Sequence, residues 1–467
     1  MKKFYLIIGG EKKTAEKTLD VINPATESVF AQAPDCSREQ LDLAVEAAGK
    51  AFQYWRIDEA ARRSGLSACA DVLRSSAEEL AELFTQEQGK TIQQSKSELD
   101  WAAWWIDKVL SMEIPVEVVL ENDTERHEMH RKPLGVIGAI MPWNYPIILA
   151  ISKIAPALLV GNTMVLKPSP YTPLTTLRMG ELFADILPPG VLNIISGGDE
   201  LGAWITNHSG IHKVTFTGSV ATGKKVARST ASNLRRVTLE LGGNDAAIVL
   251  ADNDPKEIAD DIFNNAFGQN GQACIAIKRL YVHEDIYYEM VDELRKRAEK
   301  VVLGDGLDPE VDIGPINNLM QLERVIELTE DAKKNGAEIL TGGKRLDRPG
   351  YFFPPTIVTS ISDGVRLVDE EQFGPVLPVI PFSDEDDVIE RANATDFGLG
   401  GSVWTKDLER GVDLAARLDC GTAGVNQHTD FHPIIPFGGA KQSGYGMQNG
   451  IWGLDELSQL QVISISK

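Results

Sequence analysis

The sequence is poor in cysteine and in basic residues, and it has no long hydrophobic run. Only four of its 467 residues are cysteine, and they show no repeated spacing. A disulfide framework needs paired cysteines, so none is expected, and a reducing cytoplasm is the expected compartment. A membrane-spanning helix needs about 20 predominantly apolar residues in succession. No stretch approaches that length, and no membrane partner is expected.

Acidic residues outnumber basic ones, and this imbalance argues against two classes of partner. The chain has 68 Asp and Glu residues against 46 Lys and Arg, which gives a net charge of −22. Nucleic acids and anionic membranes both attract clustered basic residues, so neither is expected to bind. With 43% hydrophobic and 24% charged residues, the composition is that of a soluble globular protein. The length favours roughly three domain-sized units.

Common signatures of catalysis and of cofactor binding are also missing. The sequence has no G-x-G-x-x-G fingerprint for a dinucleotide. It has no G-x-S-x-G elbow or Ser-His-Asp arrangement for a hydrolase. No metal site is expected from its seven histidines. Any chemistry must therefore come from other residues.

The alternation of strands and helices predicts an α/β fold. From residue 134 onward, short apolar strands alternate with helices, which is typical of a parallel sheet covered on both faces. Such sheets bind ligands beyond the carboxyl ends of their strands. The residues expected at those ends are Asn144, Lys167, Gly218 and Glu240. The second half alternates in the same way and predicts a second α/β domain that begins near Gly243.

Cys274 is the candidate nucleophile. It follows a turn of small residues, Gly271-Gln-Ala273, and precedes an apolar, β-leaning run. A thiol at such a junction can attack a substrate carbonyl while its own backbone N–H donates to the oxyanion that forms. The alternative is an inert core residue, because cysteine is among the most often buried residue types.

Glu240 and Asn144 are the other candidates for catalysis. Glu240 ends a strand just before Gly242 and Gly243. A carboxylate in a partly apolar cleft has a raised pKa and can deprotonate water; the alternative is a solvated or capping glutamate. Asn144 precedes the helix expected from Pro146 and could donate to an oxyanion. Its alternative role is the N-cap of that helix.

Two further segments are candidates for nucleotide binding. Gly218–Lys225 is spaced like a P-loop, but Lys225 stands where a Ser or Thr would hold magnesium. A helix N-terminus that binds a diphosphate is therefore favoured over a triphosphatase. Glu370–Pro375 is an acidic turn that could accept hydrogen bonds from sugar hydroxyls, with a plain surface loop as the alternative.

Short motifs also occur in one order along nearly the whole chain. They are Pro142-Trp-Asn144, Lys167-Pro-Ser169, Phe216-Thr-Gly-Ser219, Glu240-Leu-Gly-Gly243, Gly271-Gln-Ala-Cys274, Glu371-Gln-Phe-Gly-Pro375 and Pro436-Phe-Gly-Gly439. Together they resemble the aldehyde dehydrogenase superfamily of NAD(P)-dependent enzymes. The resemblance implies a Rossmann-type NAD(P)-binding domain (1–112 and 134–242), an α/β catalytic domain (243–442) and a small β oligomerisation segment (113–133 and 443–467). It also implies a homodimer or homotetramer, in which the strand-like tail 460–466 finds its partner in a neighbouring subunit.

The resemblance assigns roles to individual residues. Cys274 resembles the nucleophile that attacks the aldehyde, Asn144 the oxyanion donor, and Glu240 the base that activates the water that hydrolyses the thioester. The positions implied to bind the cofactor are Trp143, Lys167, Ser169, Gly218, Ser219, Leu241, Glu371 and Phe373. The implied cofactor is NAD. NADP is also permitted, because Pro170 stands where NAD-preferring relatives often carry a Glu that repels a 2′-phosphate.

The expected substrate is an uncharged aliphatic or aromatic aldehyde. By family position, the entry channel is lined by Trp101, Trp105, Tyr145, Ile275, Phe431 and Phe437. This set is aromatic and has no cation, so it does not favour aldehydes that bear a carboxylate. The helical spacing of the tryptophans also fits simple packing. The alternatives are a semialdehyde dehydrogenase, an acylating or esterase-like relative that uses Cys274, and a non-catalytic member of the family.

Overall fold

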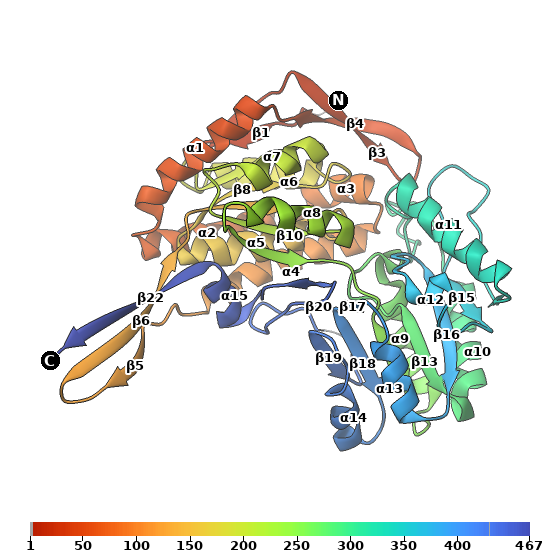
Figure 1. Cartoon of the computed structure of the whole chain (residues 1–467). Helices are drawn as coiled ribbons and strands as arrows, with labels where there is room; N and C mark the ends of the chain where they lie inside the picture. Colours follow the sequence, from red (N-terminus) through yellow and green to blue (C-terminus); the bar gives the residue numbers. More distant parts are fainter. Residues whose placement is uncertain (1–2, 429) are drawn as a thin grey trace.

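The computed structural model describes residues 3–428 and 430–467. Two α/β lobes lie next to each other, and a narrow arm projects from the first lobe (Figure 1). The first lobe holds an eight-stranded sheet and the second a seven-stranded sheet. The central strands of both sheets run parallel. The α/β class with parallel sheets is therefore confirmed.

The first sheet places the predicted strand ends along one edge. Its order is β2-β1-β9-β8-β7-β10-β11-β21. The strands are β1 (Leu6–Ile8), β2 (Glu11–Lys13), β7 (Val136–Ile140), β8 (Thr163–Lys167), β9 (Leu192–Ile194), β10 (Lys213–Thr217), β11 (Arg236–Glu240) and β21 (Gly444–Tyr445). The parallel register sets Lys167 beside Ile140, and Glu240 beside Thr217. The carboxyl ends of β8, β7, β10 and β11 are therefore neighbours.

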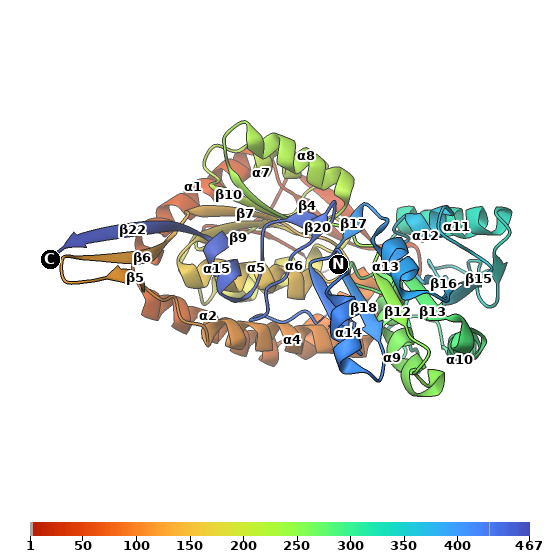
Figure 2. The same ribbon diagram turned by 60° about the horizontal axis from the view of Figure 1, so that its bottom comes forward.

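Helices cover both faces of the first sheet. Figure 2 shows α7 and α8 on one side of β7 and β10, and α2 and α4 on the other. The helices of this lobe are α1 (Arg38–Trp55), α2 (Glu59–Ser75), α3 (Ala77–Gln88), α4 (Ile92–Leu110), α5 (Pro146–Val160), α6 (Leu174–Ala184), α7 (Asp199–Asn207), α8 (Val220–Ala231) and α15 (Gly450–Glu456). A hairpin of β3 (Lys17–Asn23) and β4 (Ser28–Asp35) adds to the lobe. Helix α5 is apolar and buried almost all round, which is typical of a central core helix.

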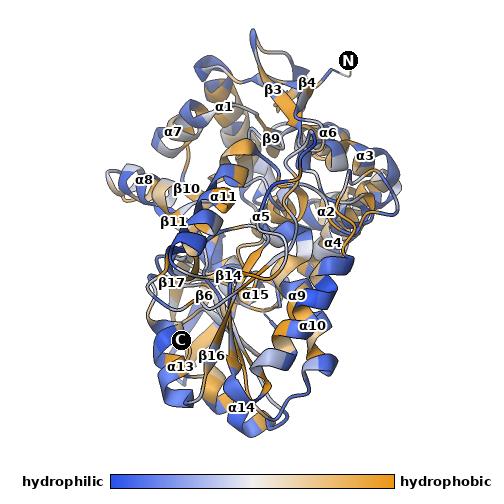
Figure 3. Cartoon of the chain, turned by 90° about the vertical axis from the view of Figure 1, so that its right-hand side faces the viewer, coloured by the Kyte–Doolittle hydropathy of each residue, from blue (hydrophilic) through white to orange (hydrophobic). Residues whose placement is uncertain are grey.

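The second sheet has the order β14-β15-β16-β13-β12-β18-β19. Its strands are β12 (Ala246–Val249), β13 (Arg279–His283), β14 (Glu338–Ile339), β15 (Thr356–Thr359), β16 (Val376–Phe382), β18 (Gly400–Trp404) and β19 (Thr422–Val425). The accompanying helices are α9 (Pro255–Phe267), α10 (Tyr287–Lys300), α11 (Leu319–Lys334), α12 (Arg366–Asp369), α13 (Glu385–Asn393) and α14 (Leu408–Ala415). Strands β17 (Phe397–Gly398) and β20 (Ala440–Lys441) pair separately. In Figure 3, hydrophobic colour marks the strand β16, while the outer helices α10 and α13 are largely hydrophilic.

The arm is a three-stranded sheet of β5 (Glu117–Glu121), β6 (Glu125–Pro133) and β22 (Ser458–Ser466). The tail strand has a partner within the chain, because β22 pairs with β6 along its whole length. Strand β22 is also an edge of this sheet, so its pairing with a neighbouring subunit stays a prediction. Strand β21 pairs instead with β11 of the first sheet, so within 443–467 only β22 belongs to the arm. In the part of the chain that the structure describes, no helix has both the length and the apolar character to cross a bilayer.

Candidate active site

Cys274 lies on a loop that contains three successive residues in the left-handed backbone conformation. After α9, a short 3-10 turn covers Gly268–Gly271, and Gln269, Asn270 and Gly271 have φ values of 52°, 57° and 68°. A side chain at Gly271 would collide with the backbone carbonyl of Gly374. Glycine is therefore required there, because only glycine combines this backbone conformation with such a close approach. The close approach holds the cysteine segment against the turn that follows Glu371.

The surroundings of Cys274 favour the neutral thiol. Burial raises its pKa to about 12, and the charge of Lys278 only partly opposes this effect. The Lys278 amine donates to the carbonyl oxygens of Ala273 (2.9 Å) and Cys274 (2.6 Å). These bonds fix the backbone on both sides of Cys274.

Asn144 faces the Cys274 segment from the first lobe. Its Nδ2 donates to the carbonyl oxygen of Gln272 at 2.9 Å. The amide carries two N–H donors, so one remains for a substrate oxygen. The alternative role as a helix cap is wrong, because the N-cap of α5 is Tyr145 and no side chain caps that position. The structure thus brings Asn144 and Cys274 together, although 128 residues separate the asparagine from Gln272.

Glu240 is a buried carboxyl without a hydrogen-bond partner. It is 5% exposed, and neither of its oxygens has a partner among the described residues. Burial raises its pKa to about 8, and the nearby charge of Lys153 offsets part of that effect. The alternatives of a solvated or a capping glutamate are therefore wrong. Glu240 can exchange a proton near neutral pH.

One cavity of about 110 Å³ collects these three residues. Its lining residues are Trp101, Asn144, Tyr145, Ile148, Leu149, Lys153, Thr217, Glu240, Ala273, Cys274, Ile275, Phe431, Phe437 and Gln448. The predicted substrate residues are among them, with the exception of Trp105. Trp105 has no exposed surface and stacks on Phe431 with ring centroids 4.7 Å apart, so it supports the wall from behind.

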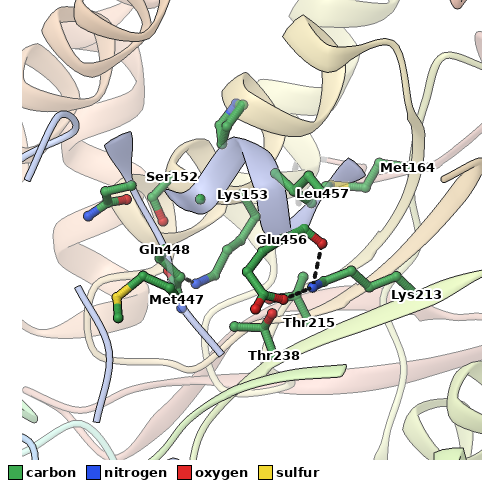
Figure 4. A pocket seen from close by; sticks show the side chains of 13 residues that line it. Ser152, Lys153, Met164, Lys213, Thr215, Thr238, Met447, Gln448, Glu456 and Leu457 are labelled. Atoms are coloured by element: carbon green, nitrogen blue, oxygen red, sulfur yellow. Dashed lines mark hydrogen bonds and ion pairs between the residues drawn. The ribbon is translucent and has the colours of Figure 1, made fainter. Parts of the chain in front are cut away.

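A smaller polar cavity of about 30 Å³ adjoins this one. Lys153 and Gln448 line both cavities, and the Lys153 amine donates to the Gln448 side chain. Figure 4 shows this pair beside a second one, in which Lys213 contacts Glu456 at 2.8 Å. The side-chain nitrogen of Gln448 and the hydroxyl of Thr238 have no partner among the described residues. Buried polar atoms of this kind are usually bonded to water.

The predicted cofactor residues follow the edge of the first sheet. Lys167 ends β8 with 4% exposure, and its amine has one acceptor among the described residues, the carbonyl of Pro168 at 3.2 Å. Burial lowers its pKa to about 8. Ser169 is also buried, and its hydroxyl accepts from the amide of Tyr171. The amine of Lys167 retains donors for ligand hydroxyls.

Gly218 and Ser219 lead directly into helix α8. Ser219 is the N-cap, and its hydroxyl accepts from the amide of Thr222 at 3.3 Å. A P-loop needs a loop of free amides before its helix, but here Gly223 and Lys224 already lie within the helix, and Lys224 binds Gln442. The segment is therefore not a P-loop. It is a helix N-terminus, which attracts phosphate through its free amides and its dipole.

The remaining cofactor positions connect the two lobes. Trp143 packs edge-on against Phe373, with ring centroids 5.4 Å apart. Glu371 accepts from the amide of Gly243 at 2.9 Å. Leu241 is buried and packs against α8 at Gly223, where a side chain would collide with it. An open groove of about 870 Å³ runs between Val220 of α8 and Glu371. Among the predicted cofactor residues, Glu371 lines this groove.

Several buried residues around the site were not predicted from the sequence. They are Lys90, Glu98, Lys153, Gln269, Lys278 and Gln448. The structure also corrects the expectation of a cation-free channel, because Lys153 lines the cavity. A signal for Lys153 was available, since it is the only charged residue in the apolar helix 146–160. The others lie in mixed sequence that gives no such signal.

Comparisons with known proteins agree with this arrangement. The aldehyde dehydrogenase family matches residues 11–463. The chain is 38% identical to aldehyde dehydrogenase LUC3 of a Fusarium species over 467 residues, which cover 99% of each chain. It resembles the solved NAD⁺ complex of an aldehyde dehydrogenase from Bacillus cereus with a TM-score of 0.94 and 36% identity, over 100% of this chain and 97% of that one. For the lactaldehyde dehydrogenase of Escherichia coli, the TM-score is 0.95 and the identity 33%, over 99% of each chain.

The two-lobed α/β fold, with a cavity at the carboxyl ends of parallel strands, is an arrangement that nucleotide-dependent enzymes commonly use. The family match then makes the assignment specific: the chain belongs to the aldehyde dehydrogenase family and is an enzyme that oxidises an aldehyde. The non-catalytic alternative has no support, since the chain retains Cys274, Asn144 and Glu240 in one cavity.

Proposed function

We propose that the protein converts an uncharged aliphatic or aromatic aldehyde to the carboxylic acid through a thioester on Cys274. The observation that carries this proposal is the single cavity shared by Cys274, Asn144 and Glu240. A thiol, an amide donor and a proton-accepting carboxyl are the three groups that covalent acyl chemistry needs. Their convergence from two lobes supports a joint role.

The thiol of Cys274 gives its proton to water, and the resulting thiolate attacks the aldehyde carbon and forms a thiohemiacetal. The oxygen becomes negatively charged in this step, and the free N–H of Asn144 and the backbone N–H of Cys274 stabilise the charge. Oxidation of the thiohemiacetal leaves a thioester. The bond between Asn144 and the carbonyl of Gln272 keeps the donor beside the cysteine while this happens.

Glu240 then activates the water that hydrolyses the thioester. Its pKa of about 8 lets the carboxylate accept a proton at neutral pH and return it afterwards. The attack of water releases the acid and restores the thiol of Cys274. Because this base is present, a free acid is favoured as the product over transfer to coenzyme A.

The predicted cofactor residues fit NAD as the cofactor. When bound, NAD⁺ accepts the hydride that leaves the substrate. Lys167 and Glu371 would hold the ribose hydroxyls, because Lys167 is buried, Glu371 is partly buried, and each has unused hydrogen-bonding capacity. Gly218 and Ser219 would hold the diphosphate at the start of α8. NADP is a second option, because no carboxylate stands at Pro170 to repel a 2′-phosphate.

The cavity wall supports the proposed substrate class. Aromatic and aliphatic side chains dominate it, and the amine of Lys153 is bound to Gln448 and turned toward the small polar cavity (Figure 4). A semialdehyde with a carboxylate is the second candidate, because Lys153 is a cation in the lining. An acylating or esterase-like reaction remains the third.

We also propose a cytoplasmic homodimer or homotetramer. Its chain is divided into 1–112 with 134–242, 243–442, and 113–133 with 443–467, the last of which contributes only β22 to the arm. Free cysteines at all four positions suit a reducing compartment. The arm exposes large apolar side chains, among them Val119 (64%) and Val462 (61%). Exposed apolar surface of this kind is typical of an interface between subunits.

A substrate panel tests the proposal. Formation of the reduced cofactor would be followed with aliphatic, aromatic and carboxylated aldehydes, each with NAD⁺ and NADP⁺. We expect the uncharged aldehydes to react faster and Cys274→Ala to lose at least a thousandfold in rate. A preference for carboxylated aldehydes would replace the substrate class with that of a semialdehyde. Full activity in Cys274→Ala would refute the nucleophile.

A further inference from the structure

A buried ion pair next to the active site has no role in the chemistry described above. Lys90 follows α3, Glu98 lies on α4, and the amine of Lys90 contacts the carboxylate of Glu98. The side chains are 1% and 2% exposed. Removing two charges from water is costly unless hydrogen bonds satisfy both. The partners of this pair therefore indicate what it does.

Lys90 binds the backbone of the proposed oxyanion donor. Its amine lies 3.3 Å from the carbonyl oxygen of Asn144 and 2.9 Å from Oε1 of Gln269, to which it donates. It also lies over the ring of Tyr145, 4.5 Å from the centroid. One cation thus contacts the peptide of Asn144, the next residue in the chain, and the segment that leads to Cys274.

Glu98 binds the helix that follows Asn144. Its Oε1 accepts from the amides of Ile147 and Ile148, both at 3.0 Å. These amides belong to the first turn of α5, where N–H groups have no partner within the helix. No side chain at the N-cap supplies one. Glu98 thereby fixes the start of α5, while its other oxygen holds Lys90.

Gln269 closes the network on the side of the second lobe. Its side-chain amide donates to the carbonyl of Asn144 and accepts from Lys90. Gln269 has a φ of 52°, which is uncommon for a residue other than glycine. Such a conformation persists where surrounding contacts impose it. The side chain of Gln269 therefore links the backbone of Asn144 to the segment that leads to Cys274.

We propose that Lys90 and Glu98 are positioning residues, which hold the side chain of Asn144 in line with Cys274 for oxyanion stabilisation. This inference rests on the oxyanion role in the proposed function. The pair touches neither the thiol nor the cavity, because neither residue is in the lining. Its effect passes through the backbone on both sides of Asn144.

Loss of the pair should slow the acylation of Cys274 with little change in aldehyde affinity. A small misplacement of a catalytic group can cost on the order of 100-fold in rate. We expect Lys90→Met and Glu98→Gln each to slow acylation by about 10- to 100-fold. Glu87→Gln is a matched control, because buried Glu87 accepts from the first amides of α6, Leu174 and Thr175. It should leave the acylation rate unchanged.

The test is a double-mutant cycle with Asn144→Ala. Acylation would be measured without cofactor, from the release of phenolate by an activated aryl ester and from the mass of the Cys274 peptide, and with cofactor from the initial burst of reduced cofactor. If Lys90 and Glu98 act through Asn144, their substitution should cost less than twofold in the Asn144→Ala background. Thermal melting of each variant would check the fold. Glu98→Gln keeps the side-chain shape should Lys90→Met not fold.

Two results would overturn the inference for different reasons. If each substitution costs the same factor in both backgrounds, the pair does not act through Asn144, although the proposed function stands. If Asn144→Ala alone leaves acylation unchanged, the oxyanion role in the proposed function fails, and the inference fails with it. A slow Glu87→Gln variant would mean that loss of any buried helix-capping carboxylate disturbs the site.

Discussion

Two buried glutamates lie near Cys274, Glu240 in the cavity lining and Glu98 outside it, and their surroundings are opposite. Glu98 uses both oxygens, one on the amides of Ile147 and Ile148 and the other on Lys90. Glu240 has no partner for either oxygen among the described residues. Hydrogen bonds to both oxygens fix the position of the Glu98 carboxylate. The unpaired carboxyl of Glu240 has a pKa of about 8 and can transfer a proton. The same type of side chain therefore fixes geometry at Glu98 and supports proton transfer at Glu240.

The largest expected effect distinguishes the two glutamates by reaction step. Glu240→Gln removes the base and should lower steady-state turnover by about 10²–10³-fold, while the initial burst of reduced cofactor persists. Glu98→Gln should instead slow the burst. Rapid-mixing absorbance measurements on both variants would check this. A normal turnover in Glu240→Gln would contradict the role assigned to Glu240.

The dependence of hydrolysis on pH should follow the ionisation of Glu240. The carboxyl must lose its proton to act as a base, so turnover should rise about tenfold per pH unit below its pKa and level off above it. With a pKa of about 8, the rise should extend through neutral pH. Steady-state rates from pH 6 to 9 would show the profile. Persistence of the same inflection in Glu240→Gln would assign it to another group.

The smallest expected effect is on stability, and its sign should differ between the glutamates. The folded-state pKa of Glu240 is about 8 against an ordinary 4.5, so the folded state binds more protons and the wild type loses stability as pH rises between these values. Glu240→Gln removes this loss and should melt a few degrees higher at pH 8 but not at pH 4.5. Glu98→Gln leaves Lys90 buried without its partner and should cost about 3 kcal/mol.

Melting curves at the two pH values would test these signs, with Glu87→Gln as a reference. If Glu240→Gln were destabilising at pH 8, the Glu240 carboxylate of the wild type would have to be paired. If Glu98→Gln had no effect on melting, Lys90 and Glu98 would contribute no net stability as a pair.

The sequence predicts the part of the site that local rules control. Parallel strands place their carboxyl ends along one edge, so Lys167, Gly218 and Glu240 could be assigned to that edge from the strand pattern alone. The turn before Cys274 was visible because small residues cluster there. Such features depend only on neighbouring residues and on the class of fold.

The supporting residues could not be predicted because their contacts are distant in sequence. Lys90 lies 179 residues from Gln269, and Lys153 lies 295 residues from Gln448. A lysine in the mixed sequence around Lys90 looks like an ordinary surface residue, and only the fold removes it from water. Helical spacing likewise placed Trp101 and Trp105 on one face, but it could not show that Trp105 lies behind Phe431.

The most direct test of the account is the mass of the Cys274 peptide during turnover. Glu240→Gln would be mixed with an aromatic aldehyde and NAD⁺, quenched in acid within seconds, digested and analysed by mass spectrometry. We predict that Cys274 carries an acyl group derived from the aldehyde. A control with both Cys274→Ala and Glu240→Gln should carry no such group. Continued oxidation of the aldehyde with an unmodified Cys274 at every time point would contradict the thioester.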